Sequence, residues 1–484
     1  MDSNTFIPQA FIDKMSTILP DNLNIDELVA ACRRPLRRAI RVNTLKINIE
    51  DFHVIANRKN WQLTPVPWCK EGFWIEIDNA TENETSPLGN SAEHLAGLFY
   101  IQEASSMMPV SALLHHFQET DNATLLDAAA APGSKTTQLA AAINNQGLII
   151  ANEYSSSRIK MLHANIQRCG IKNVALSHFD AAVFGQWLPN TFDAILLDAP
   201  CSGEGTVRKD KQAMKNWDQA AIESISTIQK TLIESAFKAL KTGGVMVYST
   251  CTLSLEENQE VCLHLKKTYP DSVEFLSLND LFKDADKTLT AEGFLHIWPQ
   301  VYDTEGFFVA AIKKTDEIES EQAQKRLRKF PFEPTKEVAK NSLYQYFDEQ
   351  FSITALTGVL YQRDDEFWLF PENIVPLIDE LRFSRLGIKI AEKFGKGRKS
   401  GFKCTHEFAT CFGQQSPLAI ELLAHQAIEY YQGRDIHDID TNNSKGEVML
   451  SYRGHVIGLG KSLDNRVKNS LPRDLIIDKN LFVE

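Results

Sequence analysis

The sequence lacks the features that mark membrane, secreted and disulfide-stabilised proteins. No apolar run approaches the roughly 18 residues that cross a membrane, and the opening MDSNTFIPQAFIDKM carries acidic side chains where a signal peptide carries basic ones. The eight cysteines are spread thinly over 484 residues without a Cys-x-x-Cys pair, so neither a disulfide framework nor a zinc finger has the spacing it needs. We therefore expect a cytoplasmic protein without membrane contact and without a bound metal.

The common glycine-rich phosphate motifs are also missing. The segment DAAAAPGSKTT (127–137) superficially resembles a phosphate loop, but Ala129 and Ser134 stand where the Walker spacing requires glycine, and no G-x-G-x-x-G dinucleotide fingerprint occurs. These two absences disfavour a nucleoside triphosphate and NAD as the ligand of this segment.

The chain as a whole has no excess of positive charge, although some short segments do. The formal net charge is −12, yet three short segments are strongly basic. They cover residues 33–46, 325–329 and 389–403. A solvated charged face explains any single cluster, whereas three clusters in one acidic chain favour a surface that follows nucleic-acid phosphates. Arg208, Lys209 and Lys211 are further candidates for phosphate contact, and a solvated role is equally open for them.

What is present, from Thr124 onward, is an alternation of short buried strands and longer helical segments. The strand candidates are TLLDAAA, GLIIANE, NVALSHFD, FDAILLDAP and VMVYSTC. The helix candidates between them are SKTTQLAAAI, SSSRIKMLHANIQRCG and the long segment 217–244. Strands separated by helices of ten or more residues predict a parallel α/β sheet that is covered on both faces. FLHIWP and GFFVAAIKK then predict a hairpin that closes one edge.

Polar residues end the five predicted strands. Asp127 ends the first, Glu153 the second, Asp180 the third, Asp198 with Cys201 the fourth, and Cys251 the fifth. The carboxyl ends of parallel strands meet at one edge of a sheet, which is where such sheets bind ligands. One capping aspartate or buried cysteine is ordinary, but five polar ends on one edge are costly to desolvate without a ligand.

The ligand that fits this edge is a nucleoside without a pyrophosphate. The loop after the first strand is small, and an acidic residue ends the second strand, where it can accept hydrogen bonds from ribose hydroxyls. This combination suits the adenosyl group of S-adenosylmethionine. We expect the backbone of the loop to wrap the methionine and ribose, Glu153 to hold the ribose hydroxyls and Asp180 to bind the adenine amino group. The predicted cofactor-binding loop consists of Ala129, Ala130, Ala131, Pro132, Gly133, Ser134 and Lys135, although Lys135 has an equally good interpretation as a surface residue.

Three motifs resemble one enzyme family. AAAAPGSKT, DAPCSGEG and YSTCTLSLEENQ, in this order and spacing, are similar to the RNA cytosine-5 methyltransferases of the Fmu and Sun type. RVNTLK (41–46) and YIQEASSMMP (100–109) resemble the N-terminal module of that family, so the similarity covers roughly residues 20–314. The long C-terminal extension is similar to that of the branch that modifies small-subunit ribosomal RNA, whose tail ends in an RNA-binding PUA domain. The resemblance implies a Rossmann-like class I methyltransferase sheet.

The chemistry of the family gives both cysteines a role. Carbon 5 of cytosine is too electron-poor to attack a methyl sulfonium, so a thiolate first adds to carbon 6 and is expelled after methyl transfer. The resemblance implies that Cys251 is the nucleophile and that Cys201 assists release of the adduct. Asp198 is placed to bind the amino and N3 edge of a flipped cytosine, and the resemblance implies that it also contacts the cofactor.

Local sequence favours the same assignment of the nucleophile. Ser254 and Glu257 have the spacing of a capping box that opens the helix LEENQEVCLHLKK, and a thiol near a helix N-terminus has a lowered pKa. The reverse assignment stays open, because a Pro-Cys dipeptide such as Pro200-Cys201 is the nucleophile motif of DNA cytosine-5 methyltransferases. Cys262 is expected in the core.

The sequence predicts four parts. They are an N-terminal α+β RNA-binding module (1–113), the methyltransferase domain (114–314), a linker with a small α/β module (315–390) and a β-rich PUA-like domain (391–484). We expect a monomer whose partner is 16S ribosomal RNA or the small ribosomal subunit, not DNA. Two alternatives are a methyltransferase for another ribosomal or transfer RNA and an RNA-binding assembly factor without catalysis. A methyltransferase for small molecules or proteins would need neither Cys201 nor Cys251.

Overall fold

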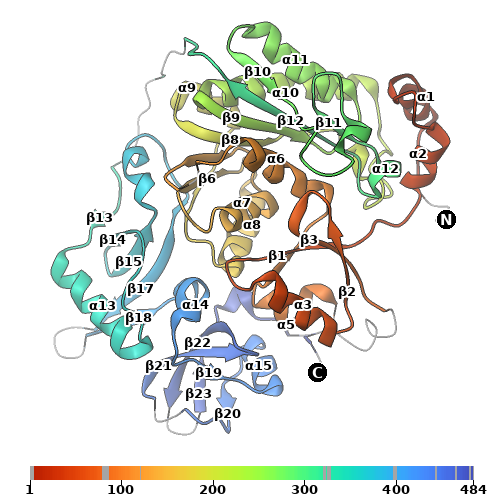
Figure 1. Cartoon of the computed structure of the whole chain (residues 1–484). Helices are drawn as coiled ribbons and strands as arrows, with labels where there is room; N and C mark the ends of the chain where they lie inside the picture. Colours follow the sequence, from red (N-terminus) through yellow and green to blue (C-terminus); the bar gives the residue numbers. More distant parts are fainter. Residues whose placement is uncertain are drawn as a thin grey trace.

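A nine-stranded sheet forms the centre of the molecule (Figure 1). Its strand order is β10-β12-β9-β8-β5-β6-β7-β16, with β11 paired to β12. The run from β9 to β7 is parallel, as the sequence predicts. These strands are β5 (Thr124–Asp127), β6 (Leu148–Asn152), β7 (Val174–Ser177), β8 (Phe192–Asp198) and β9 (Leu240–Thr250). The computed structural model describes the chain except residues 1–4, 79–86, 120, 320–322, 324–328, 396–399, 442–443, 464–465, 479–480 and 483–484.

Helices cover both faces of this sheet because its strands are apolar on both sides. Alternate residues of one strand face opposite ways, so Leu125 packs in one core cluster and Leu126 in the other. The first face carries α6 (Met108–His116), α7 (Ser134–Ala142) and α8 (Ser156–Cys169). The second face carries α9 (Phe184–Trp187), α10 (Gln219–Ala239) and α11 (Gln259–Thr268). Helix α10 is shorter than the predicted segment 217–244, because β9 begins at Leu240.

Antiparallel strands extend the sheet at both edges. β12 (Phe307–Lys314) lies between β9 and β10 (Val273–Leu276), and β11 (Leu295–Ile297) pairs with it, which confirms the predicted hairpin. At the far edge, β16 (Arg385–Leu386) arrives from the C-terminal half and pairs with β7.

The N-terminal part is a mixed α+β module. Two helices, α1 (Gln9–Ile18) and α2 (Ile25–Cys32), precede a four-stranded antiparallel sheet of order β2-β3-β1-β4. The strands are β1 (Ala39–Val42), β2 (Gln62–Val66), β3 (Cys69–Glu76) and β4 (Phe99–Ile101). The helices beside this sheet are α3 (Ile49–Arg58) and α5 (Ala92–Leu95).

The C-terminal part contains two small sheets. The first has the order β13-β14-β15-β17-β18, and the second has the order β19-β21-β22-β23-β20. The first comprises β13 (Glu333–Pro334), β14 (Val359–Arg363), β15 (Glu366–Phe370), β17 (Ile388–Phe394) and β18 (Gly401–Cys404). The second comprises β19 (Ile420–Glu421), β20 (Ile436–His437), β21 (Gly446–Tyr452), β22 (His455–Leu463) and β23 (Arg466–Asn469). The accompanying helices are α13 (Glu337–Phe351), α14 (His406–Phe412) and α15 (Ala424–Tyr431).

The last sheet packs against the N-terminal module. One hydrophobic cluster contains Ile40 and Phe99 of that module together with Leu422, Tyr431 and Leu450 of the C-terminal part, and Figure 1 shows the last sheet beside α3 and α5. In the residues that the structure describes, no helix is long and apolar enough to span a membrane.

Candidate active site

The two cysteines of the sequence motifs meet at the carboxyl edge of the sheet. Asp198 at the end of β8 is in register with Ser249 of the parallel neighbour β9, so the loops that follow these strands leave the sheet side by side. The sulfur of Cys201 lies 3.1 Å from the sulfur of Cys251, and both residues are half-buried. The sequence prediction that these thiols share one site is therefore consistent with the geometry.

The surroundings of Cys201 favour its protonated form. The hydrogen bond with Cys251 and burial raise the pKa of the Cys201 thiol well above its ordinary value, with the hydrogen bond as the larger cause. A thiol that keeps its proton is a poor nucleophile but can donate a hydrogen bond to a neighbouring thiolate.

The predicted capping box at Ser254 and Glu257 is wrong. Helix α11 begins only at Gln259, after a short 3-10 turn over Leu255–Glu257, and the Ser254 hydroxyl caps neither element. That hydroxyl donates instead to Glu204 at 2.8 Å. The N-terminus of α11 is therefore not available to activate Cys251 in the way that the sequence suggests.

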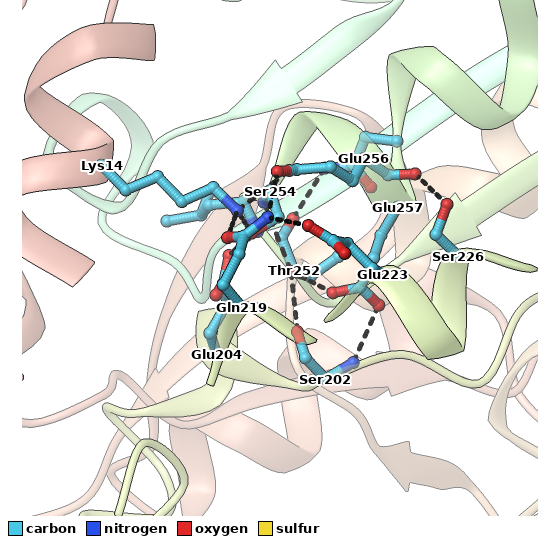
Figure 2. A network of polar contacts seen from close by, with 12 residues as sticks. Lys14, Ser202, Glu204, Gln219, Glu223, Ser226, Thr252, Ser254, Glu256 and Glu257 are labelled. Carbon is cyan, nitrogen blue, oxygen red and sulfur yellow. Dashed lines mark hydrogen bonds and ion pairs between the residues drawn. The ribbon is translucent and has the colours of Figure 1, made fainter. Parts of the chain in front are cut away.

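Two buried glutamates clasp the cysteine loops together (Figure 2). Glu204, three residues after Cys201, accepts from the backbone N–H of Leu253 at 3.1 Å. Glu257 accepts in the other direction from the backbone N–H of Ser202 at 2.9 Å. Both carboxylates are almost fully buried. Each loop is thus held by a carboxylate that belongs to the other loop.

Further polar contacts surround the two carboxylates of this clasp. Trp217 Nε1 donates to Glu204 at 2.6 Å, and Gln229 Nε2 donates to Glu257 at 2.9 Å. Burial raises the pKa of Glu257, although the donors from Ser202 and Gln229 oppose this. The spacing of the two cysteines therefore depends on side chains from α10 and its preceding loop as well as on the loops themselves.

The N-terminal helix α1 also contacts this network (Figure 2). Lys14 forms an ion pair of 2.9 Å with Glu256 and donates to Ser254 at 3.0 Å and to Gln219 at 2.9 Å. These bonds connect a helix of the N-terminal module to the loop that carries Cys251.

Asp198 and Lys135 form an ion pair beside the cysteines. Lys135 Nζ lies 2.7 Å from Asp198 Oδ2 and 3.2 Å from Ser106 Oγ, while Ser249 donates to Asp198 Oδ1 at 2.7 Å. The Lys135 side chain is 8% exposed, so the interpretation of Lys135 as a surface residue is wrong. Asp198 keeps 31% of its side chain exposed and has acceptor capacity left for a ligand.

The loop after β5 has the backbone geometry of a close ligand contact. The Ala130 N–H donates to the carbonyl of Asn152 at 2.8 Å, which holds the loop against β6. Gly133 adopts φ of +105° and is followed by α7, a conformation that favours glycine. The start of α7 is held by Arg41 of the N-terminal module, which donates to the Ser134 carbonyl at 2.8 Å and to Thr137 at 2.9 Å.

Carboxylates follow β6 and β7. Glu153 is buried and accepts from the N–H of Ala131 at 3.2 Å and from that of Ser155 at 2.8 Å. Asp180 is exposed and accepts from the N–H of Ala182 at 3.0 Å. Each carboxylate retains lone pairs for further donors, so ribose hydroxyls at Glu153 and an amino group at Asp180 fit these strand ends.

Asp127 differs from the other strand-end residues because it faces inward. It is fully buried and accepts from the Thr136 hydroxyl at 2.7 Å, and burial raises its pKa to about 6. Its contact is with α7, which makes it a link between β5 and the loop rather than an exposed ligand group.

A second pair of carboxyl groups lies near Lys135. The Glu305 N–H donates to Glu103 at 3.3 Å, and burial, followed by the charge of Glu103, raises the pKa of Glu305 to about 8. Backbone hydrogen bonds connect the segment that carries Glu305 to the loops of the two cysteines. The N–H of Gly306 donates to the Gly205 carbonyl at 3.0 Å, and the N–H of Gly205 donates to the Cys251 carbonyl at 3.1 Å.

Several basic residues that the sequence offers for RNA contact are structural. The Arg208 side chain is 1% exposed, pairs with Asp303 at 2.7 Å and donates to the carbonyls of Pro35 and Thr304, so it cannot reach phosphates. Arg41 is buried and holds the start of α7 through the Ser134 carbonyl. Lys46 donates to the carbonyls of Ala96 and Arg168.

Other basic residues stay on the surface. Arg33, Arg34, Arg38, Lys209 and Lys211 are exposed. The cluster 325–329 lies outside the described residues except for its last member, and 396–399 of the cluster 389–403 also lie outside them. Cys262 is fully buried in the core, as predicted.

Sequence reasoning missed Glu204, Glu103, Glu305 and Lys14. Each acts through a partner far away in the chain, for which a single sequence carries no signal. Across the described ranges, we find no group of three or more histidine, cysteine or acidic side chains that could hold a metal ion.

Family models match four successive parts of the chain. The matches are "16S rRNA methyltransferase RsmB/F" over residues 114–313, "N-terminal domain of 16S rRNA methyltransferase RsmF" over 7–104, "Ribosomal RNA small subunit methyltransferase F, pre-PUA domain" over 332–411 and "Methyltransferase RsmF PUA domain" over 417–477.

Whole proteins and solved structures are similar as well. Ribosomal RNA small subunit methyltransferase F of Psychromonas ingrahamii is 68% identical, with 100% of both chains covered. The crystal structure of a methyltransferase homolog protein from Pyrococcus horikoshii is 33% identical with a TM-score of 0.51, covering 64% of this chain and 100% of that one. NSun6 from Pyrococcus horikoshii, solved with SFG, is 23% identical with a TM-score of 0.55, covering 64% and 99%, and supports the fold alone. The predicted class I methyltransferase fold with a C-terminal PUA domain is confirmed.

Proposed function

The chain belongs to the ribosomal RNA small subunit methyltransferase F family, and from this premise we propose that it methylates carbon 5 of a cytosine in 16S ribosomal RNA through a covalent cysteine adduct. S-adenosylmethionine-dependent methylation of ribosomal RNA follows from the family. The cytosine-5 position and the adduct are our inference. The observation that carries the inference is the distance of 3.1 Å between the sulfurs of Cys201 and Cys251 at adjacent strand ends.

S-adenosylmethionine supplies an electrophilic methyl group on its sulfonium when it is bound. The residues that would hold it are the loop 129–135, Glu153 at the ribose and Asp180 at the adenine. Asp198 would face both the methyl group and the target base. The positive φ of Gly133 and the two carboxylates with free acceptor capacity fit an adenosyl group that has no pyrophosphate.

Cys251 is the proposed nucleophile. Its thiolate forms a bond to carbon 6 of the flipped cytosine, and the electrons of the 5,6 double bond move to carbon 5, which becomes nucleophilic. After methyl transfer, a water molecule takes the proton of carbon 5, the electrons of that C–H bond re-form the 5,6 double bond, and the bond between carbon 6 and sulfur breaks to release the thiolate. Cys201 keeps its own proton because its pKa is raised well above the ordinary value, so its S–H can donate a hydrogen bond to the departing thiolate and stabilise it.

Asp198 and Lys135 would hold the base. Their charged groups form an ion pair of 2.7 Å. The carboxylate can then accept from the exocyclic amino group of cytosine, and the ammonium can donate to the ring edge. The hydrogen bond that the ammonium donates withdraws electron density from the ring while the thiolate adds, and the hydrogen bond that the carboxylate accepts positions the base.

The division of labour among the parts is also a proposal. The matches to the N-terminal, catalytic, pre-PUA and PUA family models support the four-part division that the sequence predicts. We propose that the outer parts position RNA, not DNA, and that the chain acts as a monomer.

Separate replacement of the two cysteines tests the proposal. We expect Cys251→Ala to abolish methyl transfer and adduct formation, whereas Cys201→Ala accumulates a covalent complex with cytosine-containing ribosomal RNA that survives denaturing electrophoresis. Cys411→Ala, a half-buried thiol in α14 far from the site, is the control and should behave as the unmodified protein. Adducts with Cys251→Ala but not with Cys201→Ala would reverse the two roles. A complete lack of adducts and of methyl transfer would remove the proposed function.

A further inference from the structure

A cleft of about 460 Å³ lies between the catalytic sheet and the first C-terminal sheet. Four aromatic rings line it, those of Phe330, Phe332, Trp368 and Phe383. Phe330 and Phe332 have ring centroids 5.3 Å apart, and Phe332 lies edge-on to Trp368 at 5.5 Å. Phe330, Phe332 and Phe383 are only half-buried, so their ring surfaces are incompletely covered by the protein.

Cationic side chains line the cleft although the protein is acidic. Its described lining contains Lys329, Arg363, Arg382 and Arg385 but neither aspartate nor glutamate, in a chain with a formal net charge of −12. Arg382 is exposed at the rim.

The arginines and rings of the cleft are already stacked. The guanidinium groups of Arg385 and Arg363 lie 4.8 Å and 5.7 Å from the ring of Trp368. Their ion-pair partners, Glu407 and Glu366, are not among the lining residues. The cleft therefore presents aromatic faces and arginine planes, a combination that binds unstacked nucleic-acid bases and adjacent phosphates.

The position of the cleft places it on the same side of the molecule as the cysteines. The N–H of Ser384 donates to the Leu176 carbonyl at 2.8 Å, and Arg385 of β16 is in register with Leu176 of β7. Because the strands are antiparallel, Arg382 and Phe383 lie beyond the carboxyl end of β7. Five strand spacings separate β9 from β16, which at about 4.8 Å each is roughly 24 Å from the Cys251 loop.

We propose that this cleft binds one unpaired base of the RNA substrate by stacking, with Arg382 contacting a neighbouring phosphate. The proposal rests on the proposed function for the identity of the RNA. Stacking on the rings of the cleft does not depend on the identity of the base, because every base has an aromatic face. We expect the cleft to tolerate any base and to hold a nucleotide about 24 Å from the methylated one.

Substitutions of Phe383 test the stacking. Phe383→Leu retains an apolar side chain without an aromatic face, whereas Phe383→Tyr retains the face. We expect Phe383→Leu to raise the Kd of the full-length protein for transcribed 16S ribosomal RNA about tenfold, and Phe383→Tyr to leave it within about twofold. Thermal melting of each variant shows whether the fold is kept, and Phe383→Ala provides a second loss of the ring.

A charge variant and an abasic probe separate the base from the phosphate. Arg382→Ala should weaken binding of both a short unstructured RNA and an abasic oligomer of the same length, whereas Phe383→Leu should weaken binding of the base-containing RNA alone. The control is Lys267→Ala, which removes an exposed charge in the last turn of α11 at the opposite edge of the sheet; it should leave both Kd values unchanged.

The outcomes distinguish this proposal from the proposed function. If Phe383→Leu and Arg382→Ala bind RNA like the unmodified protein while that protein methylates ribosomal RNA, the cleft has another occupant and this proposal is overturned. If the unmodified protein transfers no methyl group, the proposed function fails, yet the Kd comparison still decides whether the cleft binds a base.

Discussion

Lys135 connects two contacts that the proposed reaction needs. It lies in the first turn of α7, at the end of the proposed cofactor loop, and its ammonium reaches Asp198 at the end of β8. The Lys135 side chain is 8% exposed and has lost most of its contact with water, which the ion pair with Asp198 partly replaces. The ion pair therefore fixes the loop relative to the strand end that is expected to meet the base.

Replacement of Lys135 should act on the chemical step. We expect Lys135→Met to lower kcat at least about a hundredfold, because the half-buried Asp198 loses its counter-charge and the base loses a donor. Methyl transfer from labelled S-adenosylmethionine measures the effect. Lys267→Met is the matched control, and a variant of Lys135 with an unchanged kcat would contradict the proposed role.

Glu305 gives the protein a titration that stability measurements can detect. Its pKa of about 8 in the folded protein exceeds the ordinary value of 4.5. Between these values the folded protein therefore binds more protons than the unfolded chain. The free energy of unfolding must then fall as pH rises across this window.

The variant Glu305→Gln should remove this dependence. We expect the Tm of the unmodified protein to drop by about 2–4 °C more than that of the variant between about pH 5 and pH 9. Calorimetry on both proteins at several pH values checks this. Parallel curves would show that Glu305 does not titrate in this window.

At the scale of elements, the clasp between the two cysteine loops makes a kinetic prediction. Glu257 accepts hydrogen bonds from Ser202, Gln229 and Thr252. A glutamine at this position would replace one accepting oxygen with an NH₂ group, which would face N–H and O–H donors and could not accept from them. We expect Glu257→Gln to lower kcat about tenfold with little change in the KM for RNA, because an unsatisfied buried group costs about 1–3 kcal/mol and displaces the loops.

Two comparisons make the clasp prediction specific. Glu223→Gln changes a glutamate at the edge of the same network, which accepts from Gln219 at 3.3 Å, and should have no effect. In the Cys201→Ala variant, which is expected to accumulate the adduct, the additional substitution Glu257→Gln should slow adduct formation. At saturating RNA, weaker RNA binding alone would not slow it. Equal adduct rates would contradict a positioning role.

The elements also show what the sequence could and could not predict. The change of hydrophobic period after Thr124 predicted the parallel strands and placed Glu153, Asp180, Asp198 and Cys251 at one edge, because that inference depends on local pattern and on the geometry of parallel sheets. The capping box was wrong because a competitor 50 residues away, Glu204, takes the Ser254 hydroxyl. Such competition between distant segments leaves no trace in a single sequence.

At the scale of the whole molecule, the N-terminal module and the C-terminal sheet depend on each other. The N-terminal module and the last sheet share one hydrophobic cluster, and Glu93 of α5 lies 3.0 Å from Lys59 and 3.5 Å from Arg453 of the C-terminal part. The C-terminal sheet therefore covers apolar surface of the module that carries Arg41.

Removal of the C-terminal sheet should consequently do more than weaken RNA binding. We expect a chain that ends at residue 416 to melt several degrees lower and to bind a hydrophobic dye, because residues such as Ile40 and Phe99 lose their cover. A truncated chain with the unmodified Tm would show that the N-terminal module is stable without its partner. Methyl transfer by that chain would then report the RNA contribution alone.

The short strand β16 has a consequence for the order in which the protein is made. It pairs with β7 across a separation on the order of 200 residues of chain. Until the ribosome has added that stretch, which takes about 10–40 s at 5–20 residues per second, the far margin of the catalytic sheet exposes unpaired backbone amides and carbonyls. The nascent enzyme is thus vulnerable to intermolecular strand pairing during this interval, and the late arrival of Arg385–Leu386 ends that exposure.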